Sequence, residues 1–72
     1  MDLVIKMTLR IRDLREDNDL TQKQIADFLH CHQSVYSNYE RGKRQIPLYA
    51  LIKLADYYGV SIDYLVGRSK NK

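Results

Sequence analysis

Apolar residues recur every three to four positions along most of this chain, with polar residues between them. Near the start, three apolar residues share the spacing i, i+4, i+7 of one helix face: Met7, Ile11 and Leu14. Thr8 can cap this helix, and the Asn18-Asp19 pair can end it in a turn. The pattern predicts a first helix over residues 9–18.

A capping box marks the start of a second helix. Thr21 is followed three residues later by Gln24, so each side chain can satisfy an unpaired backbone N–H of the other. Apolar residues follow at once, at Ile25, Phe28 and Leu29, and this predicts a helix over residues 22–29. The segment 30–32 (HCH) interrupts the pattern. A third helix is then predicted over residues 33–41, before the glycine at position 42 supplies a left-handed end.

Pro47 suits the first turn of a fourth helix, because its missing N–H would be unpaired there anyway. Apolar residues then follow at helical spacing up to Gly59: Leu48, Leu51, Ile52, Ala55 and Tyr58. Ser61 can cap a last short helix, and Gly67 can end it. A strand is conceivable only at residues 3–6. We therefore predict an all-α fold, divided into an N-terminal extension (1–7), a helical domain (8–67) and a basic tail (68–72).

Length, cysteine content and charge narrow the class of protein. Seventy-two residues suffice for one small core. The single cysteine, Cys31, allows no internal disulfide, so a reducing cytoplasm fits best. The first residues match neither a signal peptide nor a membrane span, so no membrane partner is expected. The net charge of +3 is unevenly distributed, with acidic residues at 13–19 and basic residues after position 40, as suits a polyanionic partner.

The helices predicted over residues 22–29 and 33–41 form a pair joined by a three-residue turn. Such a pair can lay its second helix in the major groove of double-stranded DNA while the first crosses the backbone. The outer face of the second helix would carry uncharged groups suited to base edges: Gln33, Ser34, Ser37 and Asn38, with Val35 beside them as a contact for a thymine methyl. Basic residues follow that could bind phosphates: Arg41, Lys43 and Arg44.

At these positions, and across roughly residues 7–67, the sequence resembles the Cro and phage-repressor-like helix-turn-helix proteins, often called the XRE family. The resemblance rests on five segments in order: 11–15 (IRDLR), 21–26 (TQKQIA), 39–44 (YERGKR) with Pro47, 51–55 (LIKLA) and 59–65 (GVSIDYL). It implies a lambda-repressor-like bundle of five helices. It also implies a sequence-specific transcriptional regulator, expected to be a repressor, that works as a homodimer on double-stranded DNA.

The resemblance also implies roles for single residues. Gln22 would contact the DNA backbone together with the basic residues after the third helix, and Arg15 would pair with Glu40. Two positions depart from the family pattern. His30 stands where glycine is usual, and His32 stands where a small hydroxyl residue usually caps the helix. Histidine tolerates positive φ better than most side chains, and a ring nitrogen of His32 could replace the usual capping oxygen.

Several alternatives remain beside this interpretation. Residues 30–32 point in different directions and no second cluster completes a zinc site, so we expect no metal or cofactor, and we expect Cys31 to pack in the core. No partnered nucleophile or phosphate loop suggests an enzyme, and no small-molecule substrate is evident. The alternative function is a protein-interaction module, such as an antitoxin or anti-repressor, whose main partner is another protein.

The tyrosines and the first apolar run bear on the core and on a dimer. Tyr36, Tyr39 and Tyr58 fall on apolar stripes and should be buried. Tyr57 and Tyr64 are candidates for a dimer contact, with incidental exposure as the alternative. Residues 3–5 could pack, pair with a partner chain or fray.

Overall fold

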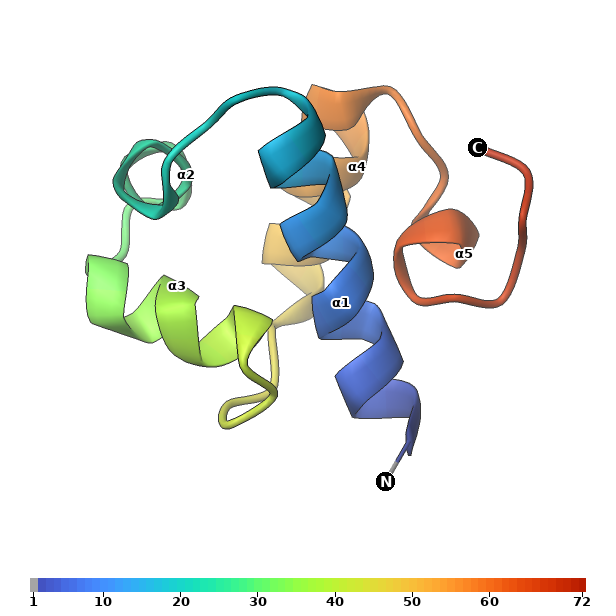
Figure 1. The fold of residues 1–72 in the computed structure, drawn as a ribbon, viewed down its shortest axis with the longest axis horizontal. Coiled ribbons are helices and arrows are strands. Elements are labelled where there is room, and N and C mark those ends of the chain that lie inside the picture. The colour runs from blue at the N-terminus through green and yellow to red at the C-terminus, as the bar shows by residue number, and fades with distance from the viewer. Residues whose placement is uncertain (1) are drawn as a thin grey trace.

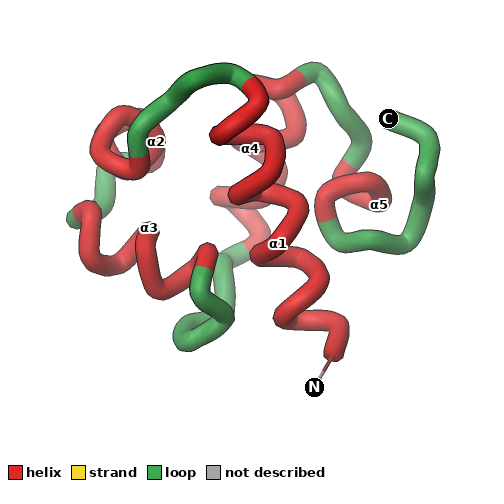
Figure 2. Tube along the Cα trace, viewed as in Figure 1, coloured by secondary structure: helices red, strands yellow, loops and turns green. Residues whose placement is uncertain are grey.

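The structure is a computed structural model that describes the backbone of residues 2–72 and the side chains of residues 10–72. It contains five helices in the order α1 (Asp2–Asp17), α2 (Gln22–Leu29), α3 (Gln33–Glu40), α4 (Leu48–Tyr58) and α5 (Ile62–Leu65). In Figure 1, α2 and α3 lie on one side of α1, α5 lies on the other, and α4 passes behind. Turns and loops join the helices, and no strand occurs in residues 2–72 (Figure 2). The predicted all-α fold is confirmed.

The first helix begins earlier than predicted. It starts at Asp2, so Thr8 lies inside it, and the predicted cap at Thr8 and the conceivable strand at residues 3–6 are both wrong. The physical reason is that residues 2–7 contain no glycine or proline and include leucine, lysine and methionine, which are strong helix formers, so nothing stops the helix at Thr8. The roles suggested for the side chains of residues 3–5 lie outside the described residues.

The ends of α2 follow the local chemistry of the sequence. The Thr21 hydroxyl accepts a hydrogen bond from Gln24 N at 3.1 Å, and the Gln24 Oε1 atom accepts one from Thr21 N at 2.8 Å. This is the predicted capping box. At the other end His30 adopts the left-handed conformation, with φ 59° and ψ 44°, and closes the helix. The sequence therefore defines both ends of α2.

The later helices deviate from prediction by one residue at an end. The third helix ends at Glu40 rather than Arg41, with Gly42 at φ 73° after it. Pro47 has an extended backbone and is the N-cap residue of α4, whereas the prediction placed it in the first turn. Ser61 caps α5 through its hydroxyl, which accepts from Tyr64 N at 3.0 Å. Arg41 and Pro47, predicted at the ends of helices, are thus cap residues, and the order of the helices is the predicted one.

One apolar core joins all five helices. Its largest fully buried side chains come from each helix in turn: Ile11, Ile25, Tyr36, Leu54 and Leu65. Tyr36 and Tyr39 are buried as predicted, and Tyr58 is half-buried against the core. Cys31 is also half-buried and packs against the core, rather than lying fully inside it. Among the described helices, none has the length and apolar character needed to cross a membrane.

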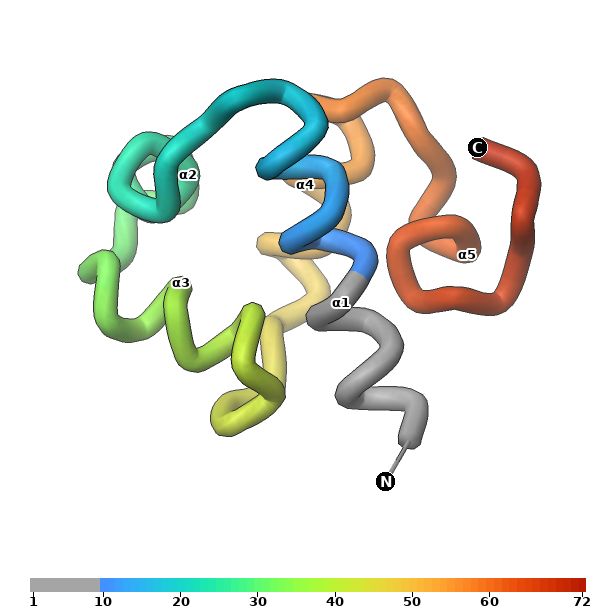
Figure 3. Tube along the Cα trace, viewed as in Figure 1, coloured from blue at the N-terminus to red at the C-terminus, as the bar shows by residue number. Residues whose placement is uncertain are grey.

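The chain after α5 folds back onto the domain (Figure 3). Ser61 N donates to the Lys72 carbonyl oxygen at 2.8 Å. Arg10, on α1, donates to the Tyr64 carbonyl oxygen at 3.0 Å, and its guanidinium lies 4.3 Å from the centre of the Tyr64 ring. The basic tail therefore lies beside α5, across α1 from α3.

Candidate nucleic-acid interface

The third helix has one buried face and one polar face. Tyr36 and Tyr39 anchor it in the core, 5% exposed or less. The four predicted base-reading residues lie on its other faces, with Gln33 and Ser34 exposed and Ser37 and Asn38 half-exposed. Val35, predicted beside them, is half-buried and packs against the core. The structure thus brings uncharged donors and acceptors together on an accessible helix of a width that fits the major groove.

The loop after α3 is tied to that helix by its backbone. The Asn38 carbonyl oxygen accepts from Lys43 N at 3.0 Å and from Arg44 N at 3.3 Å. Gly42, at φ 73°, makes the turn that allows this return, in a conformation that glycine adopts without strain. The side chains of Arg41, Lys43 and Arg44 are exposed. Three cationic groups are therefore held beside the polar face of α3.

The turn between α2 and α3 is closed by backbone contacts. His30 N donates to the Asp27 and Ala26 carbonyl oxygens, and Cys31 N donates to Ala26 O at 3.0 Å. His30 takes the expected positive φ. The expected ring-nitrogen cap is wrong, because His32 makes no capping hydrogen bond to the α3 backbone. Together with Asp27, residues 30–32 line an open hollow. No group of three or more potential ligands among the described residues could hold a metal ion.

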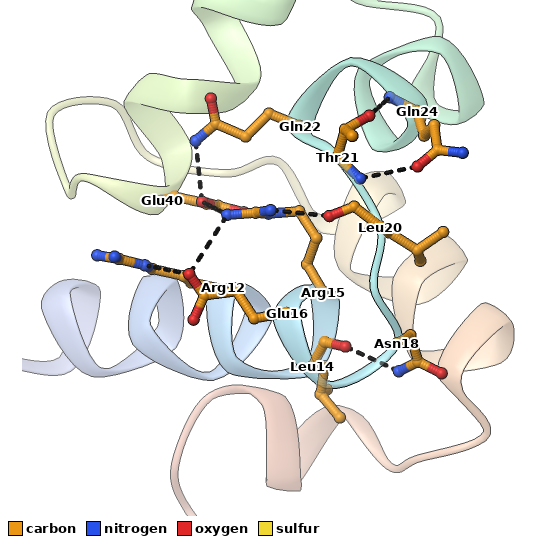
Figure 4. A network of polar contacts seen from close by, with 10 residues as sticks. All are labelled: Arg12, Leu14, Arg15, Glu16, Asn18, Leu20, Thr21, Gln22, Gln24 and Glu40. Carbon is orange, nitrogen blue, oxygen red and sulfur yellow. Dashed lines mark hydrogen bonds and ion pairs between the residues drawn. The ribbon is translucent and has the colours of Figure 1, made fainter.

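A buried ion pair ties α1 to the end of α3 (Figure 4). The Arg15 Nε atom lies 2.6 Å from Glu40 Oε2, and its Nη2 atom donates to Oε1 at 3.1 Å. A third nitrogen, Nη1, donates to the Leu20 carbonyl oxygen at 2.9 Å. The Glu40 side chain is 2% exposed. Burial opposes its charged form, but hydrogen bonds headed by that from Arg15 outweigh burial and lower the pKa of Glu40. The pairing of Arg15 with Glu40 implied by the resemblance is confirmed.

Gln22 joins this ion pair from the first position of α2. Its Nε2 atom donates to Glu40 Oε1 at 3.0 Å, so the side chain expected to contact DNA is half-exposed and already holds one internal bond. The sequence pattern does not predict this contact. The only signal for it was that α2 begins with an amide and α3 ends with a carboxylate, and their proximity depends on how the two helices pack.

A second exposed surface is apolar and lies mainly on α4. Four of the large exposed apolar side chains belong to this helix: Leu48, Tyr49, Ile52 and Tyr57. Phe28 extends the surface from α2, since its ring lies 4.9 Å from that of Tyr57. We call these five residues the α4 face. Leu48 is the most exposed of the five, at 65%.

Comparison with known proteins identifies a matching family and several similar transcriptional regulators. A family model described as Helix-turn-helix matches residues 11–65. The chain is 39% identical over 61 residues to the cryptic phage CTXphi transcriptional repressor RstR of Vibrio cholerae, covering 85% of this chain and 55% of that protein. It is 38% identical over 61 residues to the HTH-type transcriptional regulator ImmR of Bacillus subtilis, covering 85% and 48%.

Two solved structures have a fold similar to that of this chain. The restriction-modification controller protein C.AhdI of Aeromonas hydrophila superposes with a TM-score of 0.75 at 33% identity, covering 89% of this chain and 96% of that one. A transcriptional regulator from Listeria innocua superposes with a TM-score of 0.83 at 29% identity, covering 92% and 62%. The chain spans about half the length of the curated regulators it matches first.

Proposed function

The chain belongs to the helix-turn-helix family of Cro and phage-repressor-like proteins, and on this premise we propose that it is a sequence-specific, double-stranded DNA-binding transcriptional regulator. We infer that it represses transcription and acts in the cytoplasm, as the likeness to a phage repressor suggests. One observation carries the proposal. The polar face of α3 is accessible and is followed by three exposed cationic residues, two of which, Lys43 and Arg44, donate their backbone N–H groups to the Asn38 carbonyl oxygen.

In this proposal α3 enters the major groove. Its amides and hydroxyls contact base edges: Gln33, Ser34, Ser37 and Asn38. The basic loop and the start of α2 contact the sugar-phosphate backbone: Gln22, Arg41, Lys43 and Arg44. The first set gains free energy only by matching a base pattern. The second set binds any sequence and fixes the register of the helix in the groove.

A salt titration with duplex DNA tests whether the chain binds DNA. The logarithm of the binding constant should fall linearly with the logarithm of salt concentration, with a slope of about −0.9 for each phosphate neutralised. Replacing Lys43 with alanine should reduce the slope by about one phosphate. The matched control is Lys70→Ala, which removes another exposed charge, from the tail beside α5. Absence of duplex binding at low salt would refute the proposed function.

Selection of preferred sites from random duplexes tests the division of labour. Gln33→Ala should relax the preference at one base pair, with a loss of about 1 to 3 kcal/mol of discrimination. Lys43→Ala should weaken all sequences about equally. An unchanged selected motif for Gln33→Ala would remove this residue from the base-reading set.

We further propose that the chain acts as a homodimer through the α4 face. A single module of this kind buries only about 600 to 1,000 Å² on DNA, so pairing two modules on adjacent half-sites gives the affinity that regulation needs. The α4 face supports this proposal because it is apolar and lies on a helix that the base-reading residues leave unused. Identical apolar surfaces can cover each other across a two-fold axis.

Sedimentation of the free chain tests the dimer. Ile52→Glu places a charge in the α4 face and should convert the dimer to a monomer, with a loss of duplex affinity at a paired site. Arg68→Glu, a surface change in the tail, is the control and should leave the mass unchanged. A wild-type chain that sediments as a monomer at all concentrations, and on DNA, would contradict the proposed dimer.

A further inference from the structure

The side-chain amide of Gln22 faces a group that can only accept hydrogen bonds. Glu40 has a lowered pKa and accepts two bonds from Arg15, so its carboxylate is ionised and offers no proton. An amide turned the other way would set its own oxygen against Oε1. The carboxylate therefore determines which end of the Gln22 amide points inward, and the nitrogen is the inward end, at 3.0 Å (Figure 4).

This orientation leaves Gln22 with a donor to spare. A primary amide carries two N–H groups, and Glu40 uses one of them. The second finds no acceptor among residues 10–72, and the side chain is half-exposed at the first position of α2. A DNA phosphate is also an acceptor only, so it can be bound by the N–H of this amide and not by its oxygen. The orientation imposed by Glu40 is the one that a phosphate contact requires.

Electrostatics allow a phosphate to approach this place. An isolated carboxylate beside Gln22 would repel an anion. Arg15 removes that obstacle, because its guanidinium contacts both Glu40 oxygens, at 2.6 and 3.1 Å. The pair is close to neutral as a unit, and it still orients the amide.

We propose that Glu40 is a positioning residue for DNA: it holds one N–H of Gln22 so that the other is directed to a backbone phosphate. The inference rests on the proposed function, since it concerns how the DNA backbone is bound. It assigns Glu40, which is buried and touches no DNA itself, a part in binding as well as in folding.

Side-chain amide NMR of the full chain tests the proposal, with resonances assigned by comparison with Gln22→Ala. In the free protein, one Gln22 amide proton should exchange with water about tenfold more slowly than the other. Adding a selected duplex should slow the second proton by a similar factor. Gln24 is the internal control, because its oxygen is bonded to Thr21 N and neither of its amide protons is held. Both of its protons should exchange fast throughout.

Modified DNA identifies the phosphate. Gln22→Ala should lower duplex affinity about five- to tenfold, the effect of one hydrogen bond. Replacing the contacted phosphate with a neutral methylphosphonate should lower wild-type affinity and leave Gln22→Ala unaffected. In Glu40→Gln, if folded, the amide can turn, and the response to that methylphosphonate should fall toward that of Gln22→Ala.

The outcomes separate the two proposals. A chain that binds no duplex loses the proposed function and this inference together. A chain keeps the proposed function if it binds duplex while the second Gln22 proton exchanges as fast as in the free protein and every methylphosphonate response equals that of Gln22→Ala. In that case the role of Glu40 is structural only, and the inference is overturned.

Discussion

The starts of α2 and α3 are separated by one short turn, yet they are held in different ways. At the start of α2, Thr21 and Gln24 cap each other, and Gln22 bonds to the buried carboxylate of Glu40. At the start of α3, the cap residue His32 makes no side-chain bond to the helix, and the approach to it passes through His30 at φ 59°. Side-chain hydrogen bonds hold the first start, whereas the hydrogen bonds at the second start come from the backbone alone.

The difference shows how the unit divides its work. Side chains at the start of α2 form hydrogen bonds within the protein, so this start is a fixed support, and Gln22 keeps only one N–H for an outside acceptor. The start of α3 leaves the side chains of Gln33 and Ser34 exposed, and in the proposed function these contact bases. A side chain that caps its own helix cannot at the same time bond to a base edge. In the proposed function, the start with fewer side-chain bonds is thus the one that contacts bases, and the start of α2 contacts only the DNA backbone.

Removing the ion pair between Arg15 and Glu40 should have the largest effect on stability. Arg15→Met leaves the buried Glu40 carboxylate without its main partner, and we expect a loss of about 3 to 5 kcal/mol in the free energy of unfolding. Urea denaturation measures it. Arg12→Met is the matched control, since Arg12 pairs with Glu16 at the surface, and its loss should stay under about 1 kcal/mol. Equal losses of stability in both variants would show that the buried ion pair stabilises the fold no more than the surface pair does.

Lowering the pH should weaken the ion pair between Arg15 and Glu40 without a mutation. The folded pKa of Glu40 is lowered, so the stabilisation is fully present above its unfolded pKa of about 4.3 and is lost as pH falls through the lower folded value. Stability should therefore decline below about pH 4. In Glu40→Gln that part of the decline should disappear, measured by thermal unfolding across pH. An identical acid profile in both proteins would mean that Glu40 gains nothing from Arg15.

The two starts also differ in how far sequence predicts them. The capping box needs only Thr21 and Gln24 at a fixed spacing, so it was predicted in full. The bond from Gln22 to Glu40 joins residues 18 positions apart and depends on the packing of α2 against α3, which no local pattern contains. His32 was wrongly expected to cap α3, because sequence shows which atoms a residue carries but not where they point. The pattern does not predict the early start of α1, because Thr8 offers a plausible cap within a run of helix formers.

Relieving the turn before α3 should have a smaller effect, of opposite sign. His30→Gly removes the steric cost of a left-handed residue and should stabilise the fold by about 1 to 2 kcal/mol. Asp19 offers a matched comparison at φ 56°. Aspartate has a short polar side chain that can hydrogen-bond locally in this conformation, which the larger imidazole ring does not, so Asp19→Gly should gain less. If His30→Gly destabilised the protein, the imidazole would have a stabilising contact that outweighs its strain.

The two caps give the most direct and the smallest comparison. Thr21→Ala removes a hydroxyl that satisfies Gln24 N and should cost about 1 kcal/mol. His32 is the equivalent cap residue of α3 but makes no capping bond. His32→Ala should therefore change the free energy of unfolding by less than half as much as Thr21→Ala. The order should reverse for DNA, because His32 adjoins the residues proposed to contact bases, whereas the Thr21 hydroxyl is bonded within its own helix. Chemical denaturation and duplex titration of the same two variants supply both orders. If His32→Ala were the more destabilising, the start of α3 would be held by its cap residue after all, and the contrast between the two helices would fail.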